Sequence, residues 1–217
     1  MTKDARDMSK AFEDFKRELR LEIRGLKEKF DGIGELTKQL QEVLKENRDL
    51  RSQNMKLTNK LEELEQFQRS NNVEIKGIPL EGEPVALIKQ IGVVIQEEVT
   101  DADIDICHRV PTARHNESNI IVRFIRRTKR NAFLSKAKKS KLDAKNFGFQ
   151  SSSTVYVNEH LTRHGKHLLA ATVQKKKELG WKFVWTAGGK VFARKEEGSP
   201  ALKIFNISDI EKMNEEL

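Results

Sequence analysis

The stretch IGELTKQLQEVLKENRDLRSQNMKLTNKLEEL, residues 33–64, repeats its apolar residues at alternating spacings of three and four. As heptads, it places ten residues at the a and d positions: Ile33, Leu36, Leu40, Val43, Asn47, Leu50, Asn54, Leu57, Leu61 and Leu64. Eight of the ten are apolar, and a single helix cannot bury so narrow a stripe. Asparagine at an a position sets the register, because only an aligned partner satisfies its amide. The stretch therefore predicts a coiled coil that joins copies of this chain into a homo-dimer or homo-trimer.

The helix is expected to begin well before this stretch, since no proline occurs ahead of Pro79. We assign residues 1–70 to one coiled-coil oligomerisation helix. Irregular apolar spacing and three glycines predict a weak point or kink near residues 25–34. A long helix folded back on the rest of the chain is the alternative interpretation.

After residue 70 the pattern changes to short strand-like and helix-like segments. Four segments are expected to be strands, namely residues 73–78, 104–110, 120–125 and 155–157. Two are expected to be helices, residues 84–98 with Pro84 in the first turn and residues 128–141 capped by Thr128. Residues 111–119 are expected to form a hairpin loop. The order β-α-β-β-α-β is that of ferredoxin-like folds, so we predict an α+β domain that resembles an RNA-recognition motif (RRM-like) over residues 72–158.

This RRM-like interpretation departs from the usual pattern at the third strand. That strand normally carries a pair of aromatic residues that stack on bases. Here it offers Arg123 and Phe124 but no aromatic pair. We therefore expect contacts from this sheet to be mainly with phosphate.

Residues 159–217 are expected to form a small α+β C-terminal domain. A helix over residues 161–179 ends at Gly180, and a hairpin follows around Gly188-Gly189. A strand over residues 203–207 and a short helix opened by a Ser208–Glu211 capping box complete it. One face of the hairpin would carry five residues: Trp181, Phe183, Trp185, Phe192 and Arg194. These aromatics are either core beneath the helix, which we favour because large apolar residues are scarce elsewhere, or a stacking platform for bases.

The positive charge of the chain is concentrated in one region. Residues 1–70 carry 16 Lys/Arg and 15 Asp/Glu, whereas residues 106–195 carry 21 Lys/Arg and only four acids, a net charge of +17. Such a density favours binding to polyanions, and phosphate contacts also release counterions. Nucleic acid is the expected partner; an acidic protein, a membrane surface or a merely solvated surface are the alternatives.

The predicted nucleic-acid contacts lie in this basic region and its hairpin. They are Arg109, Arg123, Arg126, Arg127, Lys129, Arg130, Lys136, Lys138, Lys139, Lys141, Tyr156, Arg163, Lys166, Lys182 and Arg194. The densest group follows the third expected strand and continues along the helix after it. That arrangement predicts charges displayed on a rigid scaffold.

Signatures of catalysis are missing from the sequence. It has no phosphate-binding loop, dinucleotide fingerprint or nucleophile elbow, and its single cysteine, Cys107, excludes a zinc-ligand cysteine cluster. His160, His164 and His167 have a spacing that could place them on one helix face, but solvent-facing or phosphate-contacting histidines explain them better than a metal site. We expect no enzymatic activity, no cofactor and no bound metal.

The chain is expected to be intracellular, in the cytoplasm, the nucleus or both. Its first residues, MTKDARDMSKAF, lack the apolar stretch of a secretion signal. No run of about 18 uncharged apolar residues occurs, so membrane insertion is not expected. A lone cysteine fits a reducing compartment.

Several blocks carry a family resemblance. VYVNEHLT (155–162), GWKFVWTAGGKVFARK (180–195) and SPALKI (199–204) resemble the C-terminal domain of the baculovirus FP protein, and IKGIP (75–79) and CHRVP (107–111) agree with the part before it. The three-part architecture is similar to the first-open-reading-frame protein of LINE-type retrotransposons, in which a coiled coil oligomerises and two further domains bind single-stranded nucleic acid as a chaperone. The resemblance implies a nucleic-acid-binding protein of viral or retrotransposon origin. A coiled-coil adaptor whose basic region binds acidic proteins is the alternative.

Overall fold

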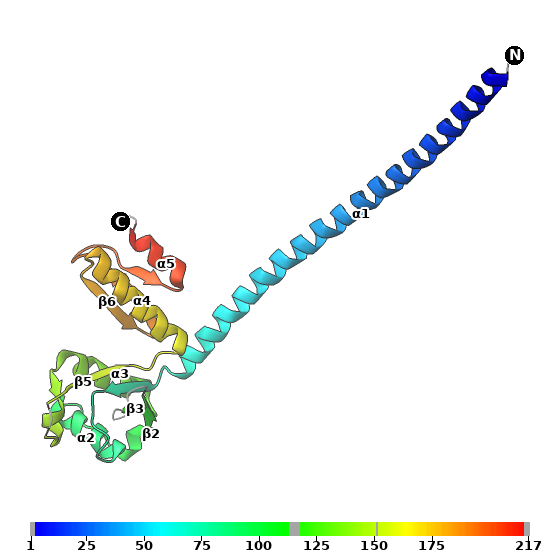
Figure 1. Cartoon of the computed structure of the whole chain (residues 1–217). Coiled ribbons are helices and arrows are strands. Elements are labelled where there is room, and N and C mark those ends of the chain that lie inside the picture. Colours follow the sequence, from blue (N-terminus) through cyan, green and yellow to red (C-terminus); the bar gives the residue numbers. More distant parts are fainter. Residues whose placement is uncertain (1–2, 113–117, 151, 215–217) are drawn as a thin grey trace. The chain divides into compact units, whose positions relative to one another are not determined.

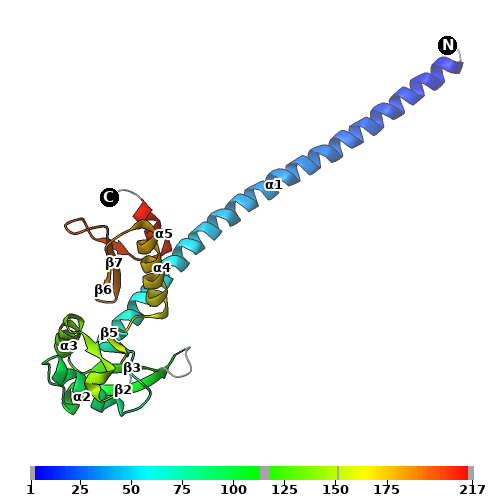
Figure 2. The same cartoon turned by 60° about the vertical axis from the view of Figure 1, so that its left-hand side comes forward.

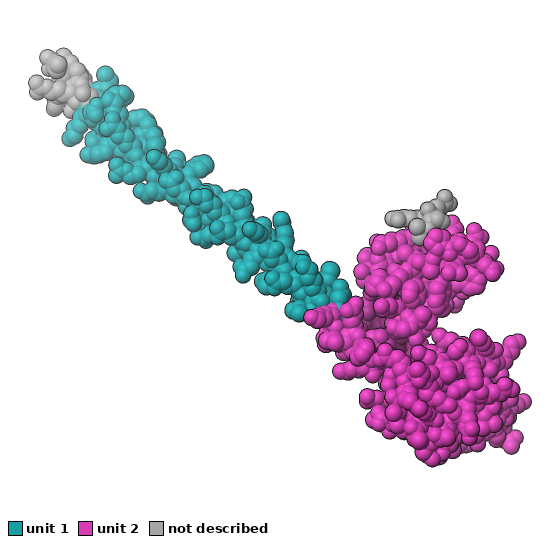
Figure 3. Space-filling model, turned by 180° about the vertical axis from the view of Figure 1, so that it is seen from behind, with its two compact units in different colours: residues 1–59 teal, residues 60–217 magenta. Residues whose placement is uncertain are grey.

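The protein is described here from a computed structural model that defines residues 3–112, 118–150 and 152–214. The chain divides into two compact units, residues 1–59 and residues 60–217 (Figure 3). None of the helices in the described ranges is long and apolar enough to cross a membrane.

The first unit consists of helix α1 (Lys3–Gln68), whose last turns belong to the second unit. The helix passes through Gly25, Gly32 and Gly34 without a break (Figure 1), so the predicted weak point does not interrupt it. One glycine weakens a helix by only about 1 kcal/mol, which the neighbouring turns can offset. The apolar a and d residues of the heptads are 55–67% exposed in the single chain.

The first sheet follows directly after this helix. Its strands are β1 (Asn72–Lys76), β2 (Ile104–Pro111), β3 (Ser118–Phe124), β4 (Leu142–Asp143) and β5 (Thr154–Glu159), in the spatial order β2-β3-β1-β5-β4 with antiparallel neighbours. Helices α2 (Pro84–Val94) and α3 (Arg127–Lys139) pack on one face of the sheet (Figure 2). The core between them contains Ile88 and Phe133 from the helices and Ile75 and Phe124 from the strands. The elements thus occur in the predicted order β-α-β-β-α-β, with β4 as an addition.

Local backbone geometry explains where these elements differ from the predicted ones. β1 ends at Lys76 instead of residue 78, because Gly77 has a φ of +82° and a Cβ there would lie 2.2 Å from the carbonyl oxygen of Thr154. α2 ends at Val94 instead of residue 98, since Gln96 turns to a φ of +57°. α3 begins one residue before Thr128, which is not its cap. Of the predicted loop 111–119, residues 118–119 belong to β3 and residues 113–117 lie outside the described residues.

The second sheet has three antiparallel strands, β6 (Phe183–Ala187), β7 (Lys190–Arg194) and β8 (Leu202–Ile204). Helices α4 (Arg163–Leu179) and α5 (Ile207–Glu211) pack on one face of it. Their shared core consists of Leu168, Trp181, Val191, Ala193, Ile204, Ile210 and Met213. The cap of α5 is Asn206 with Asp209, not Ser208 with Glu211, because Asp209 accepts hydrogen bonds from the backbone N–H groups of Phe205 and Asn206.

Candidate nucleic-acid interface

The dense basic cluster after residue 122 is divided between two sides of the first sheet. β3 alternates, so Val122 and Phe124 enter the core while Arg123 lies on the opposite, open face, across from Asn72 of β1. α3, which carries the next basic residues, covers the core face. The cluster is therefore not one continuous surface.

Acidic residues at the start of β2 and in the segment before it neutralise much of this cluster. Four ion pairs do so: Arg123–Asp105 (3.1 Å), Arg126–Asp103 (3.2 Å), Lys129–Glu97 (2.9 Å) and Lys136–Glu97 (2.6 Å). Hydrogen bonds from Lys136 and Lys129 hold the pKa of Glu97 below its usual value. The acidic residues between positions 97 and 105 thus lie against the basic cluster, and charge counted along the chain overstates the charge offered to a ligand.

Two of the predicted contacts are structural residues. Arg130 is only 6% exposed; its Nε donates to the carbonyl oxygen of Asn72 (3.2 Å) and its guanidinium pairs with Glu159 (3.5 Å). Burial lowers the pKa of Arg130. Arg109 donates to the carbonyl oxygens of residues 79, 81 and 82 at 2.6–3.1 Å and to the hydroxyl of Ser118. The prediction that these two arginines contact nucleic acid gains no support from this arrangement, because their donors are already used inside the fold.

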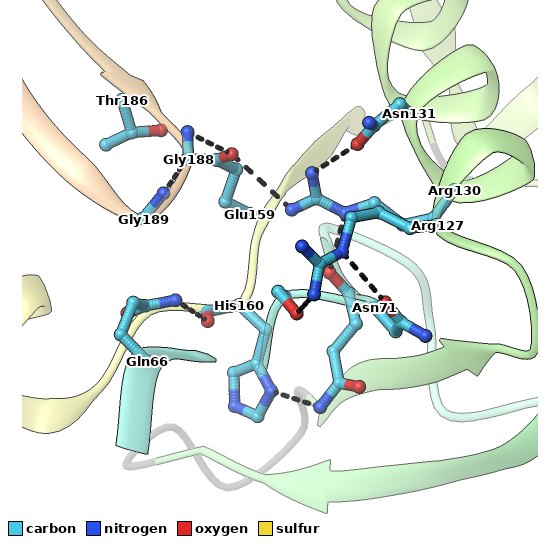
Figure 4. Close-up of polar contacts among 12 residues, drawn as sticks. Gln66, Asn71, Arg127, Arg130, Asn131, Glu159, His160, Thr186, Gly188 and Gly189 are labelled. Carbon is cyan, nitrogen blue, oxygen red and sulfur yellow. Dashed lines mark hydrogen bonds and ion pairs between the residues drawn. The ribbon is translucent and has the colours of Figure 1, made fainter. Parts of the chain in front are cut away.

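Arg127 is exposed but also held within the chain. Its guanidinium donates to the Ser70 hydroxyl (2.6 Å) and to Asn71 Oδ1 (3.3 Å), and it lies 5.1 Å from the ring centroid of Phe67. Figure 4 shows this arginine beside Asn71, where α1 ends and β1 begins. Arg127 therefore ties α3 to the end of α1.

The open face of the first sheet has a buried acid at its centre. Glu74 is 3% exposed and accepts hydrogen bonds from Lys166 (2.8 Å) and Asn119 (2.9 Å). The side chains of β3 on this face are Asn119, Ile121 and Arg123, so the strand has no aromatic pair there, as its sequence indicated. Tyr156 of β5 is an exposed aromatic residue on this face, at 58%.

A polar network joins the two sheets within residues 60–217. Glu159, at the end of β5, accepts hydrogen bonds from the backbone N–H groups of Gly188 (2.9 Å) and Gly189 (3.0 Å) in the β6–β7 turn while it also pairs with Arg130 (Figure 4). Gln66 donates to the carbonyl oxygen of His160 and accepts from the N–H of Thr162, both at 3.1 Å. These contacts fix the second sheet against the first.

His160 belongs to this network and not to a metal site. Its Nδ1 lies 3.1 Å from the side-chain nitrogen of Asn72, and burial lowers its pKa to about 4. His164 and His167 are exposed. Within the described ranges, no group of three or more His, Cys, Asp or Glu side chains could hold a metal ion.

Other predicted cations keep their charge available to a ligand. Lys139, Lys141, Arg163 and Lys182 are exposed, and their side chains have no hydrogen-bond or ion-pair partner among the residues that the structure describes. Lys138 donates only to the carbonyl oxygen of Thr186 (3.4 Å), next to Trp185. These cations come from α3, the segment after it, α4 and the start of the second sheet.

The hairpin aromatics are not all core, which corrects the interpretation that the sequence favoured. Trp181 is core, at 4% exposure, but it precedes β6 and does not follow the alternation of the strand. Phe183, Trp185 and Phe192 alternate with the core residues Val184, Val191 and Ala193, so they lie on the outward face. The strand register also places Lys190 and Lys203, which the sequence analysis missed, on that face.

The comparisons with known proteins concern this second sheet. Residues 162–214 match the sequence profile of baculovirus FP protein domain 2. The match covers α4, the three strands and α5, and so supports the resemblance for this part of the chain. No curated protein matches the chain.

Proposed function

We propose that this protein is a non-enzymatic, intracellular homo-oligomer that binds single-stranded RNA or DNA, mainly through phosphate contacts. The observation that carries the proposal is the set of unpaired exposed cations just described: Lys139, Lys141, Arg163 and Lys182. The described acids of residues 106–195 do little to neutralise them, because Glu159 and Asp143 accept hydrogen bonds from other groups and Glu178 pairs with Lys175. Exposed charge of one sign attracts a polyanion.

Oligomerisation would come from α1. The apolar a and d side chains are more than half exposed in the single chain, and burying them in a coiled coil with further copies would remove that apolar surface from water. Asn47 and Asn54 would then face their counterparts and fix the register. Joining several basic units raises the affinity for a long strand, since each further contact becomes intramolecular.

The arrangement of the first sheet supports the RRM-like part of the proposal. Its four long strands lie in the order β2-β3-β1-β5 with two helices on one face, as in a split βαβ fold. Together with the match to baculovirus FP protein domain 2, this favours a viral or retrotransposon origin similar to the LINE-type proteins, and a chaperone or packaging role.

The test is binding of fluorescent single-stranded and double-stranded oligonucleotides by the full chain across a salt series. We expect the affinity to fall steeply with salt. Replacing Lys139, Lys141, Arg163 and Lys182 by glutamine should flatten the salt dependence by about one unit of slope for each cation that contacts phosphate.

The matched control removes charge elsewhere. Lys38 and Lys45 are on α1 at heptad positions outside a and d. Replacing both by glutamine should therefore leave the affinity and its dependence on salt concentration unchanged. If the wild-type chain fails to bind any oligonucleotide, the proposal is wrong. Recovery of an acidic protein partner after nuclease treatment would then favour the adaptor alternative.

A further inference from the structure

We infer that the outward face of the β6–β7–β8 sheet is a stacking platform for unpaired nucleobases. The inference rests on the proposed function and deepens it. It assigns the binding of bases to the second sheet, whereas the preceding proposal concerned phosphate alone. The aromatic residues of the platform are Phe183, Trp185 and Phe192.

The geometry of the platform follows from the strand register. Trp185 of β6 lies directly across from Phe192 of β7, and Phe183 lies across from Arg194. The rings of Trp185 and Phe192 are 5.6 Å apart between centroids and within 15° of parallel. Phe183 is 42% exposed. Trp185 and Phe192 thus form a partly buried cross-strand stack, and a base would stack at the end of this pair or on the more exposed ring of Phe183.

The position of these rings, one exposed and two partly buried on the side away from the core, favours a partner. The other side of the same strands buries smaller residues, Val191 and Ala193, while the larger aromatic rings face outward. An outward cluster of large apolar residues with a polar rim is characteristic of a binding surface. Phe205, 56% exposed just after β8, extends the aromatic surface.

Cations surround the rings and are not neutralised by acids of the same face. The Arg194 guanidinium lies 5.5 Å from the Trp185 ring centroid, and in the described part of the chain its buried Nε has no hydrogen-bond partner. Lys203 lies across from Phe192 and 3.9 Å from the Phe205 ring centroid. Burial and the nearby charge of Lys190 lower the pKa of Lys203, with Glu63 of α1 as an opposing charge.

This combination favours single-stranded nucleic acid over other partners. Bases stack on aromatic rings while lysines and arginines hold the phosphates between them, and stacking works only with bases that are not already paired. An acidic peptide would use the cations but not the row of rings. A second copy of this chain would bring the same positive charges into contact, which is unfavourable.

The test compares two ligands that share their phosphates but differ in their bases. An oligothymidylate of about 30 nucleotides and an abasic oligomer of equal length are titrated against the full chain at one salt concentration. We expect Trp185→Ala to lower the affinity for oligothymidylate about tenfold and to leave the affinity for the abasic oligomer unchanged. Trp185→Phe, which keeps a ring, should retain most of the affinity.

A second measurement does not depend on how the alanine variant folds. The chain has two tryptophans, so Trp181→Phe leaves Trp185 as the only one. Its fluorescence should be quenched by oligothymidylate and not by the abasic oligomer or by duplex DNA. The control is Met55→Ala, which removes an exposed large side chain from α1 outside the a and d positions; we expect it to leave the affinity for oligothymidylate unchanged.

The outcomes separate this inference from the proposed function. If the wild-type chain binds neither ligand, the proposed function fails. If it binds both ligands equally and Trp185→Ala changes nothing, the function stands and the platform is overturned. A loss from Met55→Ala equal to that from Trp185→Ala would overturn it too. A change in the sedimentation of the oligomer caused by Trp185→Ala would also overturn it, because the face would then contact another copy.

Discussion

The open face of the first sheet and the outward face of the second differ in how far their polar groups are satisfied. On the first, the central acid Glu74 is buried under Lys166 and Asn119, and the arginine Arg123 is paired with Asp105. On the second, the Arg194 guanidinium lies 5.5 Å from the ring centroid of Trp185 and has no acidic partner among the described residues. A charge that is already paired contributes little to ligand binding, whereas an unpaired one is available. Local sequence charge was higher at the first sheet, yet the cations on its open face are the ones that are paired.

The largest expected effect is on stability, and it concerns Arg130, which is buried between α3 and the first sheet. Arg130→Met should lower the free energy of unfolding by about 3–5 kcal/mol, because it leaves the buried carboxylate of Glu159 with one fewer partner. Urea denaturation of the full chain, followed by circular dichroism, measures this.

Lys139→Met, on the exposed side of the same helix, is the matched control and should change stability by less than about 0.5 kcal/mol. Equal stabilities of the two variants would show that Arg130 is not held as described. It would then return to the set of candidate nucleic-acid contacts.

The second prediction compares the two faces of the second sheet. Ile204→Ala creates a cavity in its core and should cost about 2–5 kcal/mol of stability. Phe192→Ala, on the outward face, should cost less than about 1 kcal/mol while it weakens binding to single strands. Denaturation and binding measured on both variants check this. A larger stability loss from Phe192→Ala than from Ile204→Ala would mean that the ring is core after all.

The smallest expected effect is a pH dependence from His160. Its pKa falls from about 6.5 in the unfolded chain to about 4 in the fold, so the unfolded state binds more protons between those values. Stability should be complete above pH 6.5 and decrease by about 1–2 kcal/mol as the pH falls towards 4, once solvent screening is allowed for.

His160→Gln should reduce this decrease, and chemical denaturation at several pH values measures it. His164→Gln, at an exposed site on α4, is the control and should leave the pH profile as in the wild type. The assignment of His160 to the buried network fails if the two variants have the same profile.

Much of the fold was predictable, because its signals are local. Hydrophobic periodicity indicated the long helix and the order of strands and helices in both sheets. Element ends were less predictable: Gly77 and Gln96 adopt positive φ angles that depend on what packs nearby. Asn206 replaces Ser208 as the cap of α5 because Asp209 folds back onto the backbone before it.

The candidate site was predictable only in its chemistry. The basic and aromatic residue types were visible, but Lys190 and Lys203 became candidates only through the register that places them beside Phe192. The internal contacts of Arg109 and Arg130 were not predictable, since nothing in their immediate sequence shows the carbonyl and carboxylate groups that they contact.

By itself, the sequence determined the heptad stripe of α1, the excess of positive charge over residues 106–195 and the alternation within each strand. Only the tertiary structure decided which charges are neutralised and which rings face outward. Arg126 meets Asp103, and Glu159 meets Gly188, across separations that no local pattern encodes. Alternation assigns residues to two faces of a strand, but the buried face is known only once α4 and α5 have packed against one of them.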